Sequence, residues 1–315
     1  MANYSISIYP LIVVIIIFMT IIGNSLVVIA VFSYRPLRKV QNYLLVSLAA
    51  SDLCVATFVM PLHVVQFLAG GRWLLGMVIC HFFTTADIFL CTSSILNLCA
   101  IALDRYWAIH DPLNYAQKRT LRFVCIIIAI VWLASGCISV PPLIGWNDWS
   151  GESLKTHCQL TTEKAFIIFS ASGSFFVPLI LMIIVYVKIF LAARQRIRTN
   201  RVLKEIVECG IILSLYQPAT FLQKREKISV AKEKRAAKTI AVIIFVFSFC
   251  WLPFFSAYVI LPFCETCSLH PKVQQAFVWL GYINSSLNPV LYGILNIEFR
   301  RGFKKILCSR SIPGH

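Results

Sequence analysis

Charged residues are scarce in this 315-residue chain: Asp, Glu, Lys and Arg together make up 13% of it, and only 13 residues are acidic. Soluble domains carry about a quarter charged residues, so an ordinary soluble fold is excluded. The sequence also lacks the HExxH, GxxxxGK[ST] and GxSxG patterns. These absences argue against a zinc protease, a P-loop nucleotidase and a serine hydrolase, and we do not expect an enzyme.

Hydrophobic residues account for 59% of the chain. They form seven apolar stretches, each long enough to cross a ~30 Å hydrocarbon core, which takes roughly 20 residues. The pattern predicts an all-α membrane protein built as a seven-transmembrane helix bundle. We expect one domain over residues 1–308, with spans over 10–32, 43–68, 78–106, 124–143, 165–190, 238–262 and 273–295, a third inner loop over 192–238, an amphipathic helix over 297–307 and a tail over 309–315.

Most of the 29 Lys and Arg residues follow the first, third, fifth and seventh spans. Because loops on the cytoplasmic side carry the Lys/Arg excess, the amino terminus is predicted outside and the carboxyl terminus inside. The formal net charge of +16 then belongs to cytoplasmic loops. We therefore expect contact with membrane lipid and no nucleic-acid partner.

Six of the 12 cysteines lie inside the spans, where cysteine behaves as a small apolar residue: Cys54, Cys91, Cys99, Cys125, Cys137 and Cys250. Cys80 and Cys158 fall on the predicted outer side, in an oxidising compartment, and are predicted to form a disulfide bond. Cys264 and Cys267 are candidates for a second, tight disulfide on the same side.

Two side chains are candidates for modification. Asn3 begins an Asn-Tyr-Ser glycosylation sequon on the predicted outer side. Cys308 follows a basic amphipathic stretch suited to the inner membrane surface, where cysteines are palmitoylated. At both positions an unmodified side chain is the alternative.

Three acidic residues, Asp52, Asp87 and Asp104, fall within the spans or at their edges. An ionised side chain at membrane depth costs at least ~2.5 kcal/mol, so it pairs, lines a cavity or binds a ligand. Measured from Cys80, Asp87 lies ~10 Å into its span and Asp104 ~36 Å, at 1.5 Å per residue. Asp87 is therefore placed to meet a cation that arrives from outside.

Asp52 lies in the middle of the second span, and other spans carry polar side chains that can reach it. A small cation such as sodium is one expected partner, and a hydrogen-bonded knot that only joins helices is the alternative. The predicted polar core comprises Asn24, Asp52, Ser94, Asn284, Ser285 and Asn288.

Seven motifs occur in order, each in its own span. They are Gly23-Asn24, Leu48-Ala49-Ala50-Ser51-Asp52, Asp104-Arg105-Tyr106, Trp132, Pro178, Cys250-Trp251-Leu252-Pro253 and Asn288-Pro289-Val290-Leu291-Tyr292. With them the chain resembles the rhodopsin-like (class A) G-protein-coupled receptors. The segments 111–120, 141–149, 173–176 and 258–264 look like those of the invertebrate tyramine and octopamine receptors, type 1 tyramine receptors especially.

This resemblance implies a multi-pass receptor of the plasma membrane for a phenolic amine, with tyramine preferred and octopamine second. Its partners would be a heterotrimeric G protein of the inhibitory Gi/o class, arrestin and receptor kinases, and it would need no cofactor beyond an allosteric sodium ion. A receptor for octopamine or another monoamine with different coupling is the alternative. A membrane transporter is a more remote alternative, and it would show repeated halves.

A phenolic amine needs a counter-ion, an aromatic surround and a partner for its hydroxyl. Asp87 would take the ammonium. Ser170 and Ser174, four residues apart on one helix face, would bond the phenol. The expected ligand-binding set is Asp87, Ile88, Cys91, Ser170, Ser174, Trp251, Phe254, Phe255, Tyr258, Trp279 and Tyr282, with Trp279 and Tyr282 as an aromatic lid beside Asp87.

The resemblance also implies an activation mechanism. Arg105 would pair with Asp104 and Glu233 in the closed state and meet Tyr186 and Tyr292 after the sixth span swings outward. Pro253 would bend that span and make it a lever. The expected switch residues are Asp104, Arg105, Tyr106, Tyr186, Glu233, Trp251, Pro253, Pro289 and Tyr292.

Overall fold

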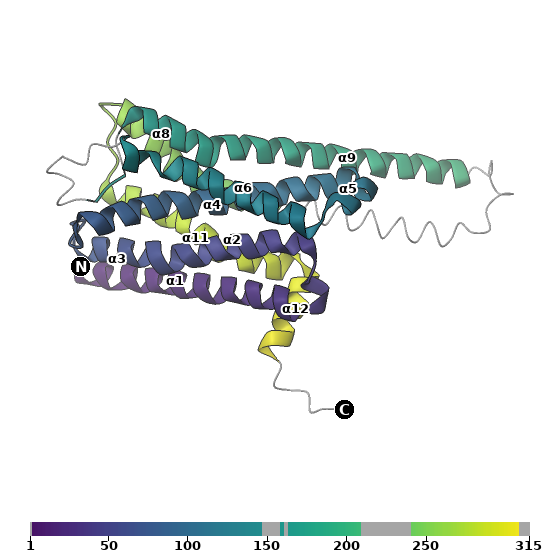
Figure 1. Cartoon of the computed structure of the whole chain (residues 1–315), viewed down its shortest axis with the longest axis horizontal. Helices are drawn as coiled ribbons and strands as arrows, with labels where there is room; N and C mark the ends of the chain where they lie inside the picture. The colour runs from purple at the N-terminus through teal and green to yellow at the C-terminus, as the bar shows by residue number, and fades with distance from the viewer. Residues whose placement is uncertain (1, 147–157, 161–162, 209–240, 309–315) are drawn as a thin grey trace.

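A computed structural model describes residues 2–146, 158–160, 163–208 and 241–308, and this part of the chain is helical and contains no strand (Figure 1). The helices are α1 (Ala2–Ser33), α2 (Tyr43–Cys54), α3 (Met60–Leu68), α4 (Gly76–His110), α5 (Pro112–Lys118), α6 (Leu121–Ser139), α8 (Lys164–Ala171), α9 (Val177–Glu208), α11 (Pro271–Leu295) and α12 (Ile297–Leu307), with a further apolar helix in Ala241–Phe263. Glu233 and most of the predicted third inner loop lie outside the described residues.

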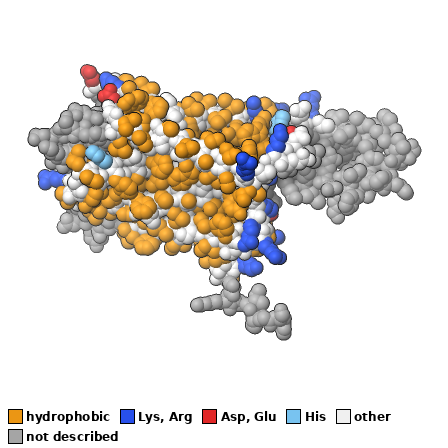
Figure 2. All heavy atoms as spheres, in the orientation of Figure 1, with side chains coloured by type: hydrophobic (Ala, Val, Ile, Leu, Met, Phe, Trp, Pro, Cys, Tyr) orange, Lys and Arg blue, Asp and Glu red, His pale blue; other side chains and the backbone are white. Residues whose placement is uncertain are grey.

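The long helices lie side by side as one bundle (Figure 1). Helix α4 runs through its centre, since α2, α6 and α9 all pack against it. On the face shown in Figure 2, hydrophobic side chains cover the length of the bundle, and Lys and Arg gather at its ends. This surface is reversed relative to that of a soluble protein and fits a hydrocarbon surround.

Six helical segments of the described chain are long and apolar enough to cross a membrane. The seventh member of the bundle is α11, which does not reach the same hydropathy. Its polar residues include Asn284 and Asn288, both 2% exposed, so they face the bundle rather than the lipid. The seven-helix bundle predicted from the sequence is confirmed.

Two of the spanning segments contain a π-helical turn. One, η3 (Val55–Val59), separates α2 from α3, and the other, η5 (Ser172–Phe176), separates α8 from α9. In each case a proline follows closely, Pro61 after η3 and Pro178 after η5. A proline ring clashes with the carbonyl four residues before it and has no N–H to donate, and the widened turn accommodates both.

Both predicted disulfides are present. Cys80 at the start of α4 is bonded to Cys158, and Cys264 is bonded to Cys267. We call the end of the bundle that carries them the disulfide end. There Gln66 of α3 donates a hydrogen bond to the carbonyl of Cys158 at 2.8 Å, so the chain around residue 158 is tied to two helices.

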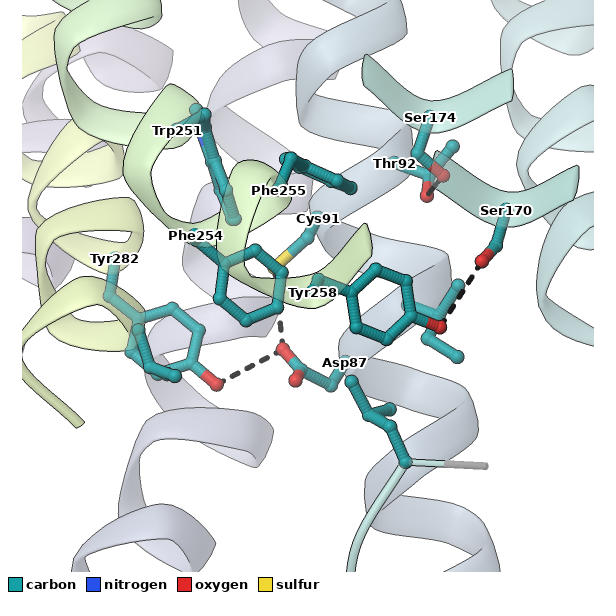
Figure 3. Close-up of a pocket in the computed structure, with 13 residues that line it drawn as sticks. Asp87, Cys91, Thr92, Ser170, Ser174, Trp251, Phe254, Phe255, Tyr258 and Tyr282 are labelled. Carbon is teal, nitrogen blue, oxygen red and sulfur yellow. Dashed lines mark hydrogen bonds between the residues drawn. The ribbon is translucent and has the colours of Figure 1, made fainter. Parts of the chain in front are cut away.

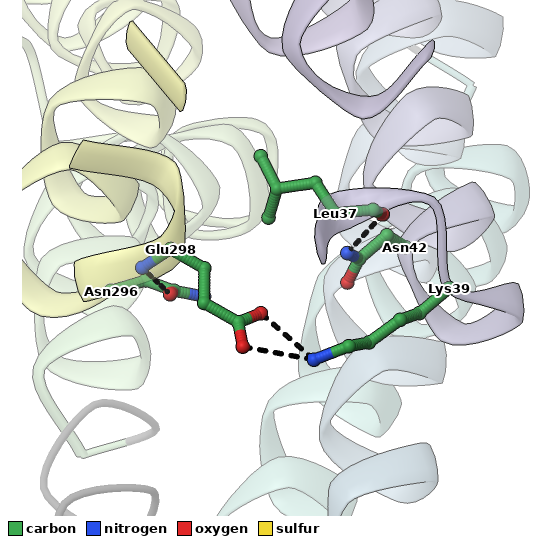
Figure 4. A network of polar contacts seen from close by, with 5 residues as sticks. All are labelled: Leu37, Lys39, Asn42, Asn296 and Glu298. Carbon is green, nitrogen blue, oxygen red and sulfur yellow. Dashed lines mark hydrogen bonds and ion pairs between the residues drawn. The ribbon is translucent and has the colours of Figure 1, made fainter. Parts of the chain in front are cut away.

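Helix α12 leaves the opposite end of the bundle at an angle (Figure 1). The Asn296 side chain caps it by accepting from the Glu298 N–H at 3.0 Å. Phe299 is fully buried, and Glu298 bonds Lys39 through both carboxylate oxygens at 2.9 Å (Figure 4). Cys308, at the end of α12, is an exposed free thiol.

Candidate ligand-binding site

A cavity opens among α4, the α8–η5 segment, the helix in Ala241–Phe263 and α11 (Figure 3). Ten of the residues expected at the ligand site line it, and Trp279 is the exception. The lining residues are Asp87, Ile88, Cys91, Thr92, Leu160, Ser170, Ser174, Trp251, Phe254, Phe255, Tyr258, Val278 and Tyr282.

Asp87 provides the negative charge of the cavity. Its Oδ1 accepts hydrogen bonds from the Tyr282 hydroxyl at 3.1 Å and from the Cys91 thiol at 3.4 Å (Figure 3). No Lys, Arg or His in the described part of the chain forms a salt bridge with it. A half-buried carboxylate with two neutral donors and no counter-ion among the described residues favours a cationic ligand.

Two hydroxyl pairs lie on the side of the cavity formed by α8 and η5. Ser170 Oγ is 3.3 Å from the Tyr258 hydroxyl, and Ser174 Oγ is 2.7 Å from Thr92 Oγ1 (Figure 3). Each hydroxyl carries one hydrogen and two lone pairs, so each pair can still accept from or donate to a third hydroxyl. Both serines are nearly buried, at 4% and 3% exposure.

Aromatic rings lie between the acid and the hydroxyl pairs. Phe254 stacks on Tyr258 with centroids 5.8 Å apart and planes 7° from parallel. Phe255 stacks on Phe175 behind it, with centroids 4.6 Å apart. Trp251 lies against both Phe254 and Phe255. The middle of the cavity is therefore a slot for a flat, apolar group.

Trp279 lies outside this lining. It is buried, and its ring makes T-shaped contacts with Tyr282 at 5.3 Å and with His63 at 5.6 Å between centroids. Three lining residues were not predicted from the sequence: Thr92, Leu160 and Val278. Thr92 follows the predicted lining residue Ile88 by four residues on α4, so its place on the same helix face was a signal that could have found it.

Asp52 lies deeper, where the polar core was expected. Both of its oxygens accept hydrogen bonds at 2.8 Å, one from Ser94 and one from Asn288. Asn24 donates to the carbonyl of Ser285 at 3.1 Å. Carboxylate, hydroxyl and amide oxygens suit a small hard cation, so the residues present fit a sodium ion.

The Asn24 amide oxygen and the Asn284 amide nitrogen of this core are buried with no hydrogen-bond partner among the described residues. Buried polar groups of this kind are usually satisfied by ordered water or an ion. The two unpaired amide atoms therefore also fit a site that holds an ordered water molecule or an ion.

At the opposite end of α4, three side chains contact the carboxylate of Asp104. Tyr115 of α5 donates to Oδ1 at 2.9 Å, Arg119 lies 3.4 Å from both oxygens, and the Arg105 Nε is 3.9 Å from Oδ2. Only Arg105 was expected there. Burial raises the pKa of the Tyr115 hydroxyl, and the neighbouring Asp104 carboxylate raises it further, so this hydroxyl stays protonated.

Of the other predicted switch residues, Trp251 lines the cavity and Pro289 lies within α11. Tyr106 lies under the Lys188 ammonium at 5.9 Å, and Tyr186 packs on its own helix against Phe190. The Tyr292 hydroxyl is buried with no hydrogen-bond partner among the described residues. The structure thus brings Asp104 and Arg105 together, and shows no hydrogen bond from Arg105 to either tyrosine among the described residues.

This arrangement of helices and cavity belongs to a known class. Residues 23–292 match the family described as 7 transmembrane receptor (rhodopsin family), and the chain belongs to that family. Its members are receptors and not enzymes.

Several individual members of this family are similar to the chain over most of its length. The chain is 58% identical to the tyramine receptor Ser-2 of Caenorhabditis elegans, over 95% of this chain and 83% of that protein. It is 39% identical to tyramine receptor 1 of Locusta migratoria, over 93% and 87% of the two chains. It is 36% identical to the octopamine receptor of Heliothis virescens, over 94% and 87%. The resemblance to biogenic-amine receptors is confirmed.

Proposed function

We propose that this protein is a plasma-membrane receptor activated by a phenolic amine, with tyramine preferred over octopamine. The observation that carries the proposal is the cavity in which Asp87, without a cationic partner among the described residues, faces two hydroxyl pairs across an aromatic slot. The relatives that bear the names of tyramine and octopamine receptors support the same ligand class.

Each part of tyramine has a counterpart in this cavity. The ammonium forms a charge-assisted hydrogen bond with Asp87, beside the ring of Tyr282. The ring enters the slot beside Phe254 and Phe255. The phenol reaches the hydroxyls of Ser170 and Ser174. Ala171, between them in sequence, adds no hydroxyl, which favours one ring hydroxyl over a catechol.

The walls between the two polar ends favour tyramine over octopamine. The β-hydroxyl of octopamine would lie near the middle of the cavity, among apolar side chains such as Ile88, Val278 and Phe254. The Cys91 thiol in this region already donates to Asp87. A hydroxyl without a partner in such surroundings costs about 1–3 kcal/mol. Octopamine remains the second candidate because it can turn its hydroxyl towards Asp87 or Tyr282.

The activated receptor would signal through a heterotrimeric G protein. The family resemblance favours the Gi/o class, which inhibits adenylate cyclase. The same resemblance implies arrestin and receptor kinases as later partners. The end of the bundle opposite the disulfides would be cytoplasmic. It carries the exposed basic residues of α12 and of the turn after α1, and cytoplasmic loops hold such residues. The amino terminus would then lie outside the cell. A sodium ion at Asp52 would stabilise the resting state.

The test is a dose–response series with tyramine, octopamine, dopamine and serotonin, with cAMP and calcium as readouts, on the wild-type receptor and Asp87→Asn. Removing one partner of a buried charge pair costs about 2–5 kcal/mol, so tyramine potency should fall about thirtyfold or more. Glu265→Gln removes an exposed acid at the disulfide end and serves as the matched control. An unchanged response of Asp87→Asn at equal surface expression would contradict the proposal.

A further inference from the structure

Trp251, in the helix in Ala241–Phe263, packs directly against Gly281 of α11. A Cβ atom added at Gly281 would lie 2.8 Å from Cζ3, 3.0 Å from Cε3 and 3.1 Å from Cη2 of the Trp251 indole. Carbon atoms without a bond between them sit about 3.5–4.0 Å apart. The indole therefore occupies the space that any side chain at position 281 would need.

The indole cannot easily move aside. Trp251 is 5% exposed, and its ring is bounded by Phe254 at 6.1 Å and Phe255 at 5.8 Å. Interiors packed in this way respond to an added methyl group through backbone shifts or strained rotamers. A methyl group at position 281 would therefore push the helix at Trp251 away from α11.

Gly281 is also the neighbour of Tyr282 in the chain, and Tyr282 donates to Asp87. Of these two consecutive residues of α11, Tyr282 thus contacts the proposed counter-ion Asp87, and Gly281 contacts Trp251 of the cavity lining. Gly281 itself does not line the cavity. A change at this position can therefore alter the position of Trp251 without removing a contact with the ligand.

We propose that Gly281 is a positioning residue for signalling: its missing side chain lets Trp251 rest against α11, and this packing holds the helix in Ala241–Phe263 in its resting position. The proposal rests on the proposed function as an amine receptor and deepens it. The contact resists an outward movement of that helix, whose bend at Pro253 lies two residues after Trp251.

The test is Gly281→Ala in membranes that contain a G protein, with basal and tyramine-stimulated nucleotide exchange as readouts. Overpacking a tight contact destabilises the arrangement that contains it, so basal exchange should rise about fivefold or more. Tyramine affinity measured without G protein should stay near that of the wild-type receptor, because no ligand contact is lost.

Two further variants separate positioning from a general effect of alanine on the helix. Gly293→Ala lies on the same helix, and its Cβ would meet Phe303 at 3.6 Å, an ordinary contact, so basal exchange should not change. Trp251→Phe removes the ring atoms that clash. In the Trp251→Phe background, Gly281→Ala should have no further effect on basal exchange.

Unchanged or lowered basal exchange in Gly281→Ala would overturn the inference, and so would an equal rise in the wild-type and Trp251→Phe backgrounds. The proposed function fails separately, by the absence of any tyramine response in the wild-type receptor. A wild-type receptor that responds to tyramine, with a Gly281→Ala variant that behaves identically, would sink the positioning role alone.

Discussion

Tyr115 is the nearest partner of Asp104 in the described chain: its hydroxyl lies 2.9 Å from the carboxylate, whereas the Arg105 Nε lies 3.9 Å away. The short helix α5 is thereby fastened to the end of α4. Arg119, which bonds the same carboxylate and also lies over the Tyr115 ring at 5.4 Å, strengthens this link. Asp104 therefore holds α5 in place as well as meeting Arg105.

Tyr115→Phe should lower signalling without changing ligand binding. The variant removes a hydrogen bond to a charged acceptor, worth about 1.5–3 kcal/mol, so G-protein activation should fall about fivefold or more because α5 is loosened and Asp104 is freer to hold Arg105. Nucleotide exchange and tyramine affinity are the two measurements. Tyr34→Phe, at the same end of the bundle, is the control, and equal losses in both variants would refute the assignment.

The Tyr115–Asp104 bond should also persist in alkaline buffer. The folded-state pKa of Tyr115 is raised above its usual value of 10.0, so its stabilising contribution is fully present below pH 10.0 and is lost only as the pH rises through the raised pKa. Thermal unfolding of wild type and Tyr115→Phe should therefore differ by the same amount at about pH 7 and about pH 9. A difference that disappears at the more alkaline pH would contradict the raised pKa.

Ser174→Ala should distinguish ligands by their phenol. Loss of one neutral hydrogen bond costs about 1 kcal/mol, so tyramine potency should fall about fivefold while that of phenethylamine, which has no hydroxyl, stays the same. Ser135→Ala, a buried serine of α6 that bonds its own helix at Val131, is the matched control. If phenethylamine loses as much potency as tyramine, Ser174 has only a packing role.

The two disulfides should differ in their effect on stability. Cys80 and Cys158 are 78 residues apart, whereas Cys264 and Cys267 are 3 apart. By loop-closure entropy the long loop is worth ~4.5 kcal/mol and the short one ~2 kcal/mol. Cys80→Ser with Cys158→Ser should abolish surface expression, and Cys264→Ser with Cys267→Ser should retain it. Flow cytometry of intact cells tests the order, and the reverse order would disprove it.

Gln66→Leu should speed ligand dissociation. The Gln66 side chain holds the carbonyl of Cys158, and Leu160, two residues later, lines the cavity. Without a hydrogen bond worth about 1 kcal/mol, residues 158–160 are held less firmly, and we expect about a fivefold faster off-rate for a labelled ligand. Gln274→Leu, an exposed glutamine at the same end, controls for the change in polarity. Equal off-rates in all three proteins would rule out this tether.

The sequence predicted the general form of the site better than its details. Asp87 stood out because a carboxylate in an apolar stretch needs a partner, and this argument requires no knowledge of packing. Ser170 and Ser174 followed from their helical spacing, but their partners could not be predicted. Thr92 and Tyr258 come from other helices, and which side chains meet across helices depends on tertiary packing.

The π turns explain a second limit on predicting the site from the sequence. Ser174 lies within η5, where the chain departs from the α-helical repeat, so an argument from α-helical spacing does not fix its direction. Trp279 shows the same limit on α11. Its spacing of three residues from Tyr282 predicted a shared face, yet only Tyr282 reaches the cavity, because the ring of Trp279 fills the space beside His63.

Helix α9 continues to Glu208, well past Ala192, where its apolar span ends, and Figure 1 shows it projecting beyond the other helices. At 1.5 Å per residue the projection is about 24 Å long. The end of α9 at Glu208 therefore lies beyond the bundle by a distance comparable to the width of a small protein domain. A partner that binds both this end of α9 and the adjoining end of the bundle must be at least that long, which sets a lower limit on the size of any protein fragment designed to block both contacts at once.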